Sequence, residues 1–170
     1  MKIHLQLIPI EELRLLAGPQ TGRPFARSFV DGALPPDFVA RRALDNLAQG
    51  AAEFWCNTFY IVRTSDDCIV GACGFKHPPE RARTDIGYGV APSCRGHGVA
   101  TAAVVELLRL AFDSGEVTEV LAEVNPNNTA STRLVERLHF ERVGEEIDDE
   151  GEHLVQWLAR APANSSTSNG

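Results

Sequence analysis

The residues best suited to chemistry lie in a glycine-bearing loop between a strand and a helix. The stretch Arg95-Gly96-His97-Gly98-Val99-Ala100-Thr101 follows a strand that ends near Val90 and begins a long helix. Gly96 and Gly98 allow backbone angles and close approaches that a side chain would forbid. The N–H groups of the loop converge at the positive end of the helix, where Arg95 adds a cation. This segment therefore favours a phosphate or pyrophosphate ligand.

Two common phosphate-binding motifs do not fit this loop. A P-loop requires a lysine directly after its last glycine, and no lysine follows Gly96 or Gly98. A dinucleotide fingerprint requires a third glycine, and Pro92 occupies that place after Gly87 and Gly89. A glycine loop before a helix can also be a tight turn alone, and the loop by itself leaves that interpretation open.

The composition of the chain narrows the class of partner. The 170 residues carry 16 basic and 23 acidic side chains, a formal charge of −7. That balance speaks against nucleic acid or an anionic membrane as the main partner. Hydrophobic residues make up 44% and charged residues 23%, which is typical of a globular protein. The composition leaves the oligomeric state, monomer or homodimer, open.

Cysteine and histidine spacing indicates neither a metal site nor a disulfide framework. Cys56, Cys68, Cys73 and Cys94 contain no C-x-x-C pair, and the histidines have no spacing typical of metal ligands. The first residues alternate like a strand and are too broken for a signal-peptide core. We therefore expect reduced thiols, no metal and a cytoplasmic protein.

Apolar periodicity predicts the elements that position the loop. Short turns between residues 55 and 90 predict an antiparallel meander, and the later part of the chain alternates helix and strand. We expect one α/β (α+β) domain over residues 1–161, with a mixed sheet of about seven strands and about four helices, and a flexible tail at 162–170. The predicted helices are 10–17, 36–49, 99–112 and 129–138; the predicted strands are 3–9, 55–63, 68–75, 83–90, 117–123, 140–147 and 153–159.

Two motifs resemble one protein family. The stretch Arg95 to Ala100 fits the R/Q-x-x-G-x-G/A pattern of the GCN5-related N-acetyltransferases (GNAT). Ile86-Gly87-Tyr88 and the N-x-x-S-x-R helix from Asn128 to Arg133 are similar to the RimJ/RimL-type ribosomal-protein alanine acetyltransferases. That branch usually closes this helix with Leu-Gly-Phe, and His139 stands in place of the glycine, where we expect a left-handed backbone. The likeness covers about residues 68–158, and residues 1–50 form a variable, acceptor-side region.

This resemblance implies a GNAT-like fold, with an antiparallel N-terminal part and splayed central parallel strands, and acetyl-CoA as the acyl donor. Backbone N–H groups from Arg95 to Ala100 would hold the pyrophosphate, with Thr101 close behind. Val90 would pair with the pantetheine arm, and Asn125 lies where the two parallel strands should part. Asn128 is placed to cap the next helix, so capping alone can explain it. The cofactor-binding residues implied are Val90, Arg95, Gly96, His97, Gly98, Val99, Ala100, Thr101, Asn125 and Asn128.

Three residues carry the implied acetyl transfer. An ammonium must lose a proton before it can attack, and Asp85, which stands where the branch often has Glu, could accept it directly or through water. Asp85 can equally be a solvated carboxylate beside Arg83. Ser131 could give a proton to the leaving thiolate, and Tyr88 could do so instead, although alternation places Tyr88 with the packed residues Ile86 and Val90.

The leading hypothesis is an N-acetyltransferase that transfers acetyl directly from acetyl-CoA to a primary amine in a ternary complex. The acceptor could be a protein N-terminus or a small amine. We expect the first 50 residues and the loop at 76–82 to shape the acceptor pocket. A non-catalytic acyl-CoA-binding sensor or partner module of the same fold is the alternative, since both need the loop from Arg95 to Ala100. The third hypothesis is an unrelated phosphate-binding domain.

Overall fold

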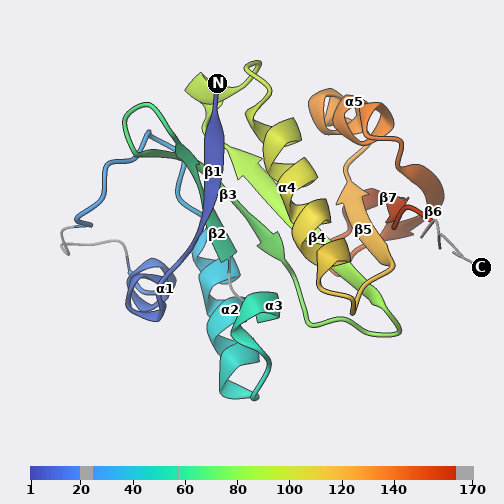
Figure 1. The fold of residues 1–170 in the computed structure, drawn as a ribbon, viewed down its shortest axis with the longest axis horizontal. Helices are drawn as coiled ribbons and strands as arrows, with labels where there is room; N and C mark the ends of the chain where they lie inside the picture. The colour runs from blue at the N-terminus through green and yellow to red at the C-terminus, as the bar shows by residue number, and fades with distance from the viewer. Residues whose placement is uncertain (20–24, 57, 164–170) are drawn as a thin grey trace, which may run out of the picture.

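A single mixed sheet organises the molecule. The computed structural model describes residues 1–19, 25–56 and 58–163. Seven strands follow one another across the sheet in the order β1-β2-β3-β4-β5-β7-β6 (Figure 1). β4 and β5 pair in parallel, and the other neighbouring strands are antiparallel. The strands are β1 (Ile3–Leu7), β2 (Thr58–Arg63), β3 (Cys68–Phe75), β4 (Arg83–Val90), β5 (Glu119–Val124), β6 (Glu141–Ile147) and β7 (His153–Arg160).

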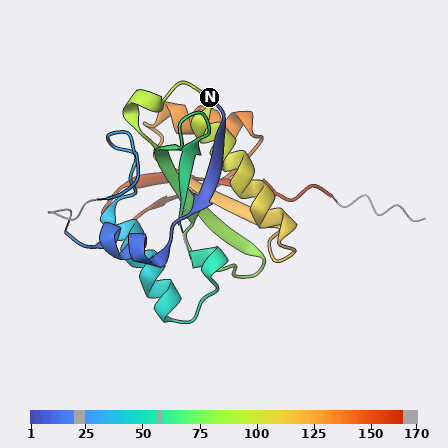
Figure 2. The same ribbon diagram turned by 60° about the vertical axis from the view of Figure 1, so that its left-hand side comes forward.

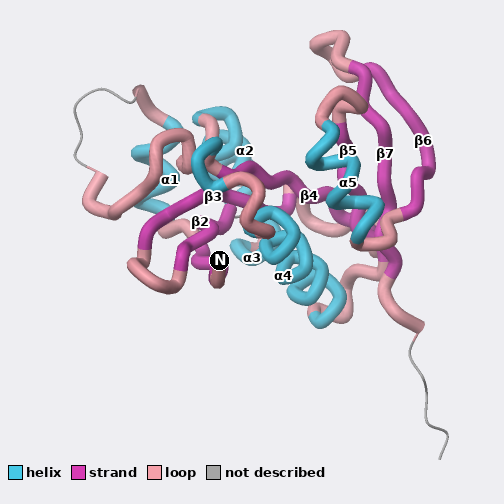
Figure 3. The backbone as a smooth tube through the Cα atoms, turned by 90° about the horizontal axis from the view of Figure 1, so that it is seen from above, coloured by secondary structure: helices cyan, strands magenta, loops and turns pink. Residues whose placement is uncertain are grey.

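Helices cover both faces of this sheet. α1 (Ile10–Ala17) and α2 (Asp37–Ala48) pack against each other (Figure 2). Seen from above, they lie on one side of the antiparallel strands and α4 (Val99–Asp113) lies on the other (Figure 3). The remaining helices are α3 (Glu53–Cys56), α5 (Thr129–Arg137) and the 3₁₀ turn η1 (Pro92–Cys94). None of the helices in the described part of the chain is long and apolar enough to span a bilayer.

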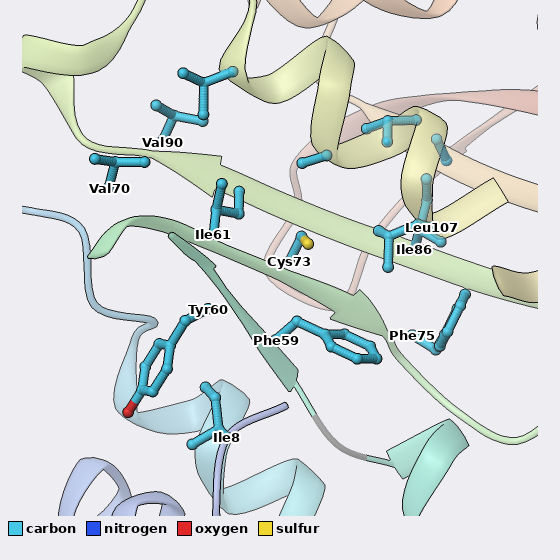
Figure 4. Close-up of a cluster of buried hydrophobic side chains, with 14 of the residues drawn as sticks. Ile8, Phe59, Tyr60, Ile61, Val70, Cys73, Phe75, Ile86, Val90 and Leu107 are labelled. Carbon is cyan, nitrogen blue, oxygen red and sulfur yellow. The ribbon is translucent and has the colours of Figure 1, made fainter. Parts of the chain in front are cut away.

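A buried hydrophobic cluster joins α4 to the sheet. Leu107 of α4 and Ile86 of β4 lie side by side at 0% and 2% exposure (Figure 4). Tyr60 of β2 lies on the opposite side of the strands, near Ile8 (Figure 4). Alternation along each strand separates these two sets, because successive side chains of a strand point to opposite faces. We call the side that carries Ile86 and Leu107 the α4 face, and the opposite side the α2 face.

The parallel pair opens partway along its length. β4 and β5 are in register from Arg83 with Glu119 to Ile86 with Ala122, and the pairing stops there. β4 continues to Val90 and still pairs with β3, where Gly71 opposes Val90. Among the described strands, none pairs with the β5-facing edge of β4 from Gly87 to Val90. The predicted splayed strands are confirmed.

Most predicted elements are confirmed with ends that differ by at most two residues, and the start of the strand predicted at 55–63 is wrong. Residues 55 and 56 were expected to begin a strand, but they belong to α3, where Trp55 N–H donates to the Ala52 carbonyl at 3.0 Å. The helical turn brings the Trp55 ring within 4.8 Å of the Phe75 ring centroid. The described residues thus contain five α-helices where about four were expected. His139 has the expected left-handed backbone, with φ of 61°. Parts of the predicted loop and tail, residues 20–24 and 164–170, lie outside the described residues.

Candidate active site

The glycine loop presents free N–H donors at the start of α4. Gly98 is the N-cap of α4 in a left-handed conformation, with φ of 75°, and no side chain caps the helix. Gly96 has φ of 79°, and a Cβ at either glycine would meet no atom within 4 Å. The positive φ explains why both positions are glycine, and the open space leaves room for a ligand. The N–H groups of Val99, Ala100 and Thr101 lack partners one turn earlier in the helix, so they can bind an anion.

Arg95 joins this loop to the end of β4. Its Nε donates to the Val90 carbonyl at 3.2 Å, while the residue as a whole is exposed. The remaining N–H groups of the guanidinium are available for a phosphate. His97 is exposed, whereas the Val99 side chain is buried in the core, so Val99 can offer only its backbone to a ligand.

Tyr88 and Ser131 meet on the α4 face. The Tyr88 hydroxyl is buried and has no hydrogen bond of regular geometry within residues 1–19, 25–56 and 58–163. Burial raises the pKa of the Tyr88 phenol, and the neighbouring Ser131 hydroxyl opposes that rise. Tyr88 also packs against the core, as alternation predicted. The structure therefore brings together the two hydroxyls that were considered as alternatives for the same proton transfer.

Asn125 and Asn128 shape the turn between β5 and α5. Asn128 Oδ1 accepts from the Ser131 N–H at 3.1 Å, which confirms its position as the N-cap of α5. Asn125 Oδ1 accepts from the Asn127 N–H at 2.8 Å, and Asn125 Nδ2 donates to Glu152 at 2.8 Å. Both asparagines thus stabilise the turn at the end of β5 through hydrogen bonds. Their expected cofactor contacts stay a prediction.

Asp85 lies on the α2 face and does not pair with Arg83. Arg83 instead contacts Glu119 at 2.6 Å, and Asp85 Oδ1 lies 3.4 Å from His77 Nε2. His77 Nδ1 is 2.7 Å from the Pro78 carbonyl, which can only accept, so Nδ1 carries a proton. The His77–Asp85 contact is an ion pair when the imidazole is doubly protonated.

Glu123 is a candidate catalytic residue that the sequence reasoning missed. It follows the last paired position of β5 by one residue and shares the α2 face with Asp85. A hydrogen bond with Glu146, burial and the charges of Glu146 and Asp85 raise its pKa to about 7, against the opposing charge of Lys76. Period-two alternation along 119–124 puts Glu119 and Glu123 on one face, which is a signal the sequence does contain.

A cavity of about 420 Å³ lies on the same face, under α2. Its floor is formed by glycines of β3 and β4, and its wall by the segment before α2 and by α2 itself. Arg95 and Lys76 also line it, so the cavity joins the end of β4 near the glycine loop to the neighbourhood of Glu123. The four cysteines are free and buried, and no three metal-binding side chains are grouped in the described residues.

Comparisons with known proteins define the class of this fold and site. A profile of the acetyltransferase (GNAT) domain matches residues 13–141. The chain therefore belongs to the GNAT acetyltransferase family, as the two motifs predicted. An uncharacterized N-acetyltransferase p20 of Bacillus licheniformis is 32% identical over 106 residues, which are 62% of this chain. The match spans 60% of the length of that relative.

Solved structures of this family share the fold over most of the chain. The ribosomal-protein-S5-alanine acetyltransferase of Vibrio fischeri superposes with a TM-score of 0.67 at 14% identity, covering 94% of this chain and 93% of the other. Mycobacterium smegmatis RimJ in complex with CoA-disulfide gives 0.66 at 19% identity, covering 94% and 82%. At these identities the likeness concerns the fold, and the expected resemblance to the RimJ/RimL branch is confirmed at that level.

Proposed function

We propose that this chain is an acetyl-CoA-dependent N-acetyltransferase that acetylates a primary amine by direct transfer. The observation that carries the proposal is the opening between β4 and β5, which begins after the pair Ile86 and Ala122. The hydroxyls of Tyr88 and Ser131 lie on one side of this opening, and the carboxylates of Asp85 and Glu123 lie on the other side. A reacting group in this opening would have a proton donor on one side and a proton acceptor on the other.

The glycine loop fits the anionic part of acetyl-CoA. Gly96 and Gly98 leave the space before α4 open, and the first N–H groups of α4 have no side-chain cap. Arg95 adds positive charge beside Val90. We assign the pyrophosphate to the N–H groups from Arg95 to Ala100, with Thr101 behind them, and the pantetheine arm to the free edge of β4 up to Val90. Asn125 and Asn128 would flank that arm from the β5 side.

When bound, acetyl-CoA supplies the acetyl group as a thioester whose carbonyl carbon the amine attacks and whose C–S bond then breaks. Glu123 accepts the proton that the acceptor ammonium must lose, because a base with a pKa of about 7 is partly unprotonated at neutral pH and still basic. The hydrogen bond with Glu146 and burial are the main causes of the raised pKa of Glu123, and the charge of Asp85 adds to them. Asp85 could also accept the proton through water.

Tyr88 and Ser131 serve the leaving group. Burial raises the pKa of Tyr88, so its phenol keeps its proton at neutral pH and can give it to the departing sulfur. Ser131 lies beside that hydroxyl and can orient it or relay the proton. The roles of both residues follow from their shared position on the α4 face.

The test is the release of free CoA thiol from acetyl-CoA in the presence of a panel of amines, with acetyl-CoA binding measured in parallel by calorimetry. The panel holds peptides with free α-amines, amino acids and alkyl polyamines. Turnover that depends on both the amine and acetyl-CoA supports the proposal. Tight acetyl-CoA binding without turnover on any amine would leave the non-catalytic binding module, and the absence of acetyl-CoA binding would overturn both.

A further inference from the structure

Arg42 occupies an unusual place in the cavity under α2. It lies one turn after Phe38 and Val39 on the helix, and all three side chains line the cavity together with Pro35. Its neighbour Arg41 points elsewhere, to the surface, where it pairs with Asp37 at 2.8 Å. Of these two consecutive arginines, only Arg42 therefore lines the pocket, whose walls are mainly apolar.

The guanidinium of Arg42 has no partner in the part of the chain that the structure describes. Within residues 1–19, 25–56 and 58–163, the other arginines are either exposed or bonded, as Arg27 is to Gln6 and Arg63 to Asp66. Arg42 is partly buried and has neither an ion pair nor a hydrogen bond in those residues. Burial lowers the pKa of Arg42, because the charged form loses part of its hydration. Burying a charge is costly unless a partner accepts its hydrogen bonds.

Carboxylates lie near Lys76, which also lines the cavity. Lys76 lines the cavity, and its charge acts on Glu123, beside which Asp85 and Glu146 add carboxylates. The cavity thus presents the Arg42 cation, which has no partner among the described residues, above the glycine floor of β3 and β4, and a group of carboxylates lies near Lys76 at the opening of the sheet. A ligand that matches this layout carries an anion at one end and an amine at the other.

We propose that Arg42 binds a carboxylate of the acceptor, so that this chain prefers amino-acid-like acceptors over simple alkyl amines and polyamines. The inference rests on the proposed function and names the acceptor class of that site. A guanidinium presents two parallel N–H donors to a carboxylate, which fixes its orientation as well as its charge. The amine of such an acceptor then points towards Glu123, where its proton is accepted. Arg42 is a specificity-determining residue and takes no part in the bond changes.

The kinetic test compares matched acids and amides. Amino acids and their primary amides are assayed with wild type, Arg42→Gln and the control Arg41→Gln. We expect the kcat/KM ratio of acid to amide to fall at least about tenfold in Arg42→Gln, since a hydrogen bond to a charged group is lost, and to stay unchanged in Arg41→Gln. The acid and the amide differ in amine basicity, but this difference is the same for every variant, so it cancels when the ratios of variant and wild type are compared. An unchanged ratio in Arg42→Gln would overturn the proposal.

A binding test works without turnover and separates this proposal from the cofactor assignment. The Arg42 side-chain Nε–H signal is followed by NMR while the same amino acids and amides are added to wild-type protein. A saturable shift caused by acids and not by their amides supports the proposal. A shift caused by acetyl-CoA alone, by acids and amides alike, or by none of them overturns it. Calorimetry with acetyl-CoA on Arg42→Gln should give wild-type affinity, so a failure of acetyl-CoA binding in wild type would count against the proposed function alone.

Discussion

The two faces of β4 carry opposite chemistry within a few residues. On the α4 face, Tyr88 is buried beside Ser131, and both are neutral hydroxyls. On the α2 face, Asp85 faces His77, and its charge acts on Glu123. Three positions along the strand separate Asp85 from Tyr88, an odd number that places them on opposite sides of the sheet.

This contrast shows how a strand can serve two substrates at once. The α4 face adjoins the helix whose N-terminus we assign to the cofactor, and the α2 face adjoins the cavity that we assign to the acceptor. Opening the β4–β5 pair removes the backbone barrier between them. Changes on the α4 face should therefore alter the cofactor or its leaving group, and changes on the α2 face should alter the acceptor and the pH profile.

The largest effect is expected from Gly98→Glu. A carboxylate at this N-cap would occupy the open space before α4 and repel a pyrophosphate, so acetyl-CoA affinity should fall at least about 1,000-fold, or about 4.1 kcal/mol. Calorimetry measures this directly. Gly115→Glu is the matched control, because Gly115 also has φ of 75° and open space around its Cβ position, but follows the other end of α4. Equal losses in both variants would assign the effect to backbone strain.

Glu123→Gln should lower kcat/KM about 100-fold, the usual scale of a general base. A base accepts a proton only when unprotonated, so wild-type activity should rise with pH through about 7, the pKa of Glu123. The variant should lose that limb and keep only the one set by the acceptor amine. Glu119→Gln, on the same face but paired with Arg83, should keep the wild-type profile.

Asp85→Asn separates the two carboxylates in the same pH–rate measurement. The Asp85 charge helps to raise the pKa of Glu123, so its removal should move the limb to lower pH and retain it. Disappearance of the limb in Asp85→Asn, with its persistence in Glu123→Gln, would assign the base to Asp85.

Glu123 also links stability to pH. Its pKa in the folded protein lies above its ordinary value, so its contribution to stability is present at low pH and is lost as the pH rises through about 7. Glu123→Gln should therefore raise Tm more at pH 8 than at pH 5. Thermal unfolding at the two pH values measures this, and an equal shift at both would contradict the raised pKa.

On the α4 face, Ser131→Ala should lower kcat about tenfold and leave acetyl-CoA affinity within about twofold, because Tyr88 still supplies a proton. Tyr88→Phe should cost more than Ser131→Ala, since it removes the buried donor itself. Steady-state kinetics and calorimetry together separate turnover from binding. A loss confined to affinity would move Ser131 from the leaving group to cofactor contact.

The smallest effect is expected from Asn128→Ala. Losing the N-cap of α5 should cost about 1 kcal/mol of unfolding free energy, which is roughly 2–4 °C in Tm. Asn128→Asp retains a cap and should restore most of that stability. Thermal unfolding measures both variants. If Asn128→Asp restores stability but acetyl-CoA binding remains weak, Asn128 also contacts the cofactor.

The sequence by itself determined the family, nearly all of the elements and the anion-binding loop. Strand and helix periods are local, as are the turn signals, and the pattern from Arg95 to Ala100 is contiguous, so all can be read from neighbouring residues. The strand start predicted at Trp55 was wrong because that prediction used only neighbouring residues. The aromatic residues around Trp55 favour a strand. In the folded chain Trp55 lies in a helical turn and contacts Phe75, which is twenty positions away.

Tertiary structure alone decided which side chains meet. The raised pKa of Glu123 comes from a hydrogen bond with Glu146, from burial and from the charges of Glu146 and Asp85, which lie on other strands, and no pattern along β5 shows that these groups come together. Asp85 found His77 where its neighbour Arg83 was considered, because Arg83 is taken by Glu119 of the parallel strand. Burial works in the same way for Arg42, which the packing of α2 over the sheet leaves without a partner among the described residues. Electrostatic interactions depend on distance and solvent access, and both are properties of the folded chain.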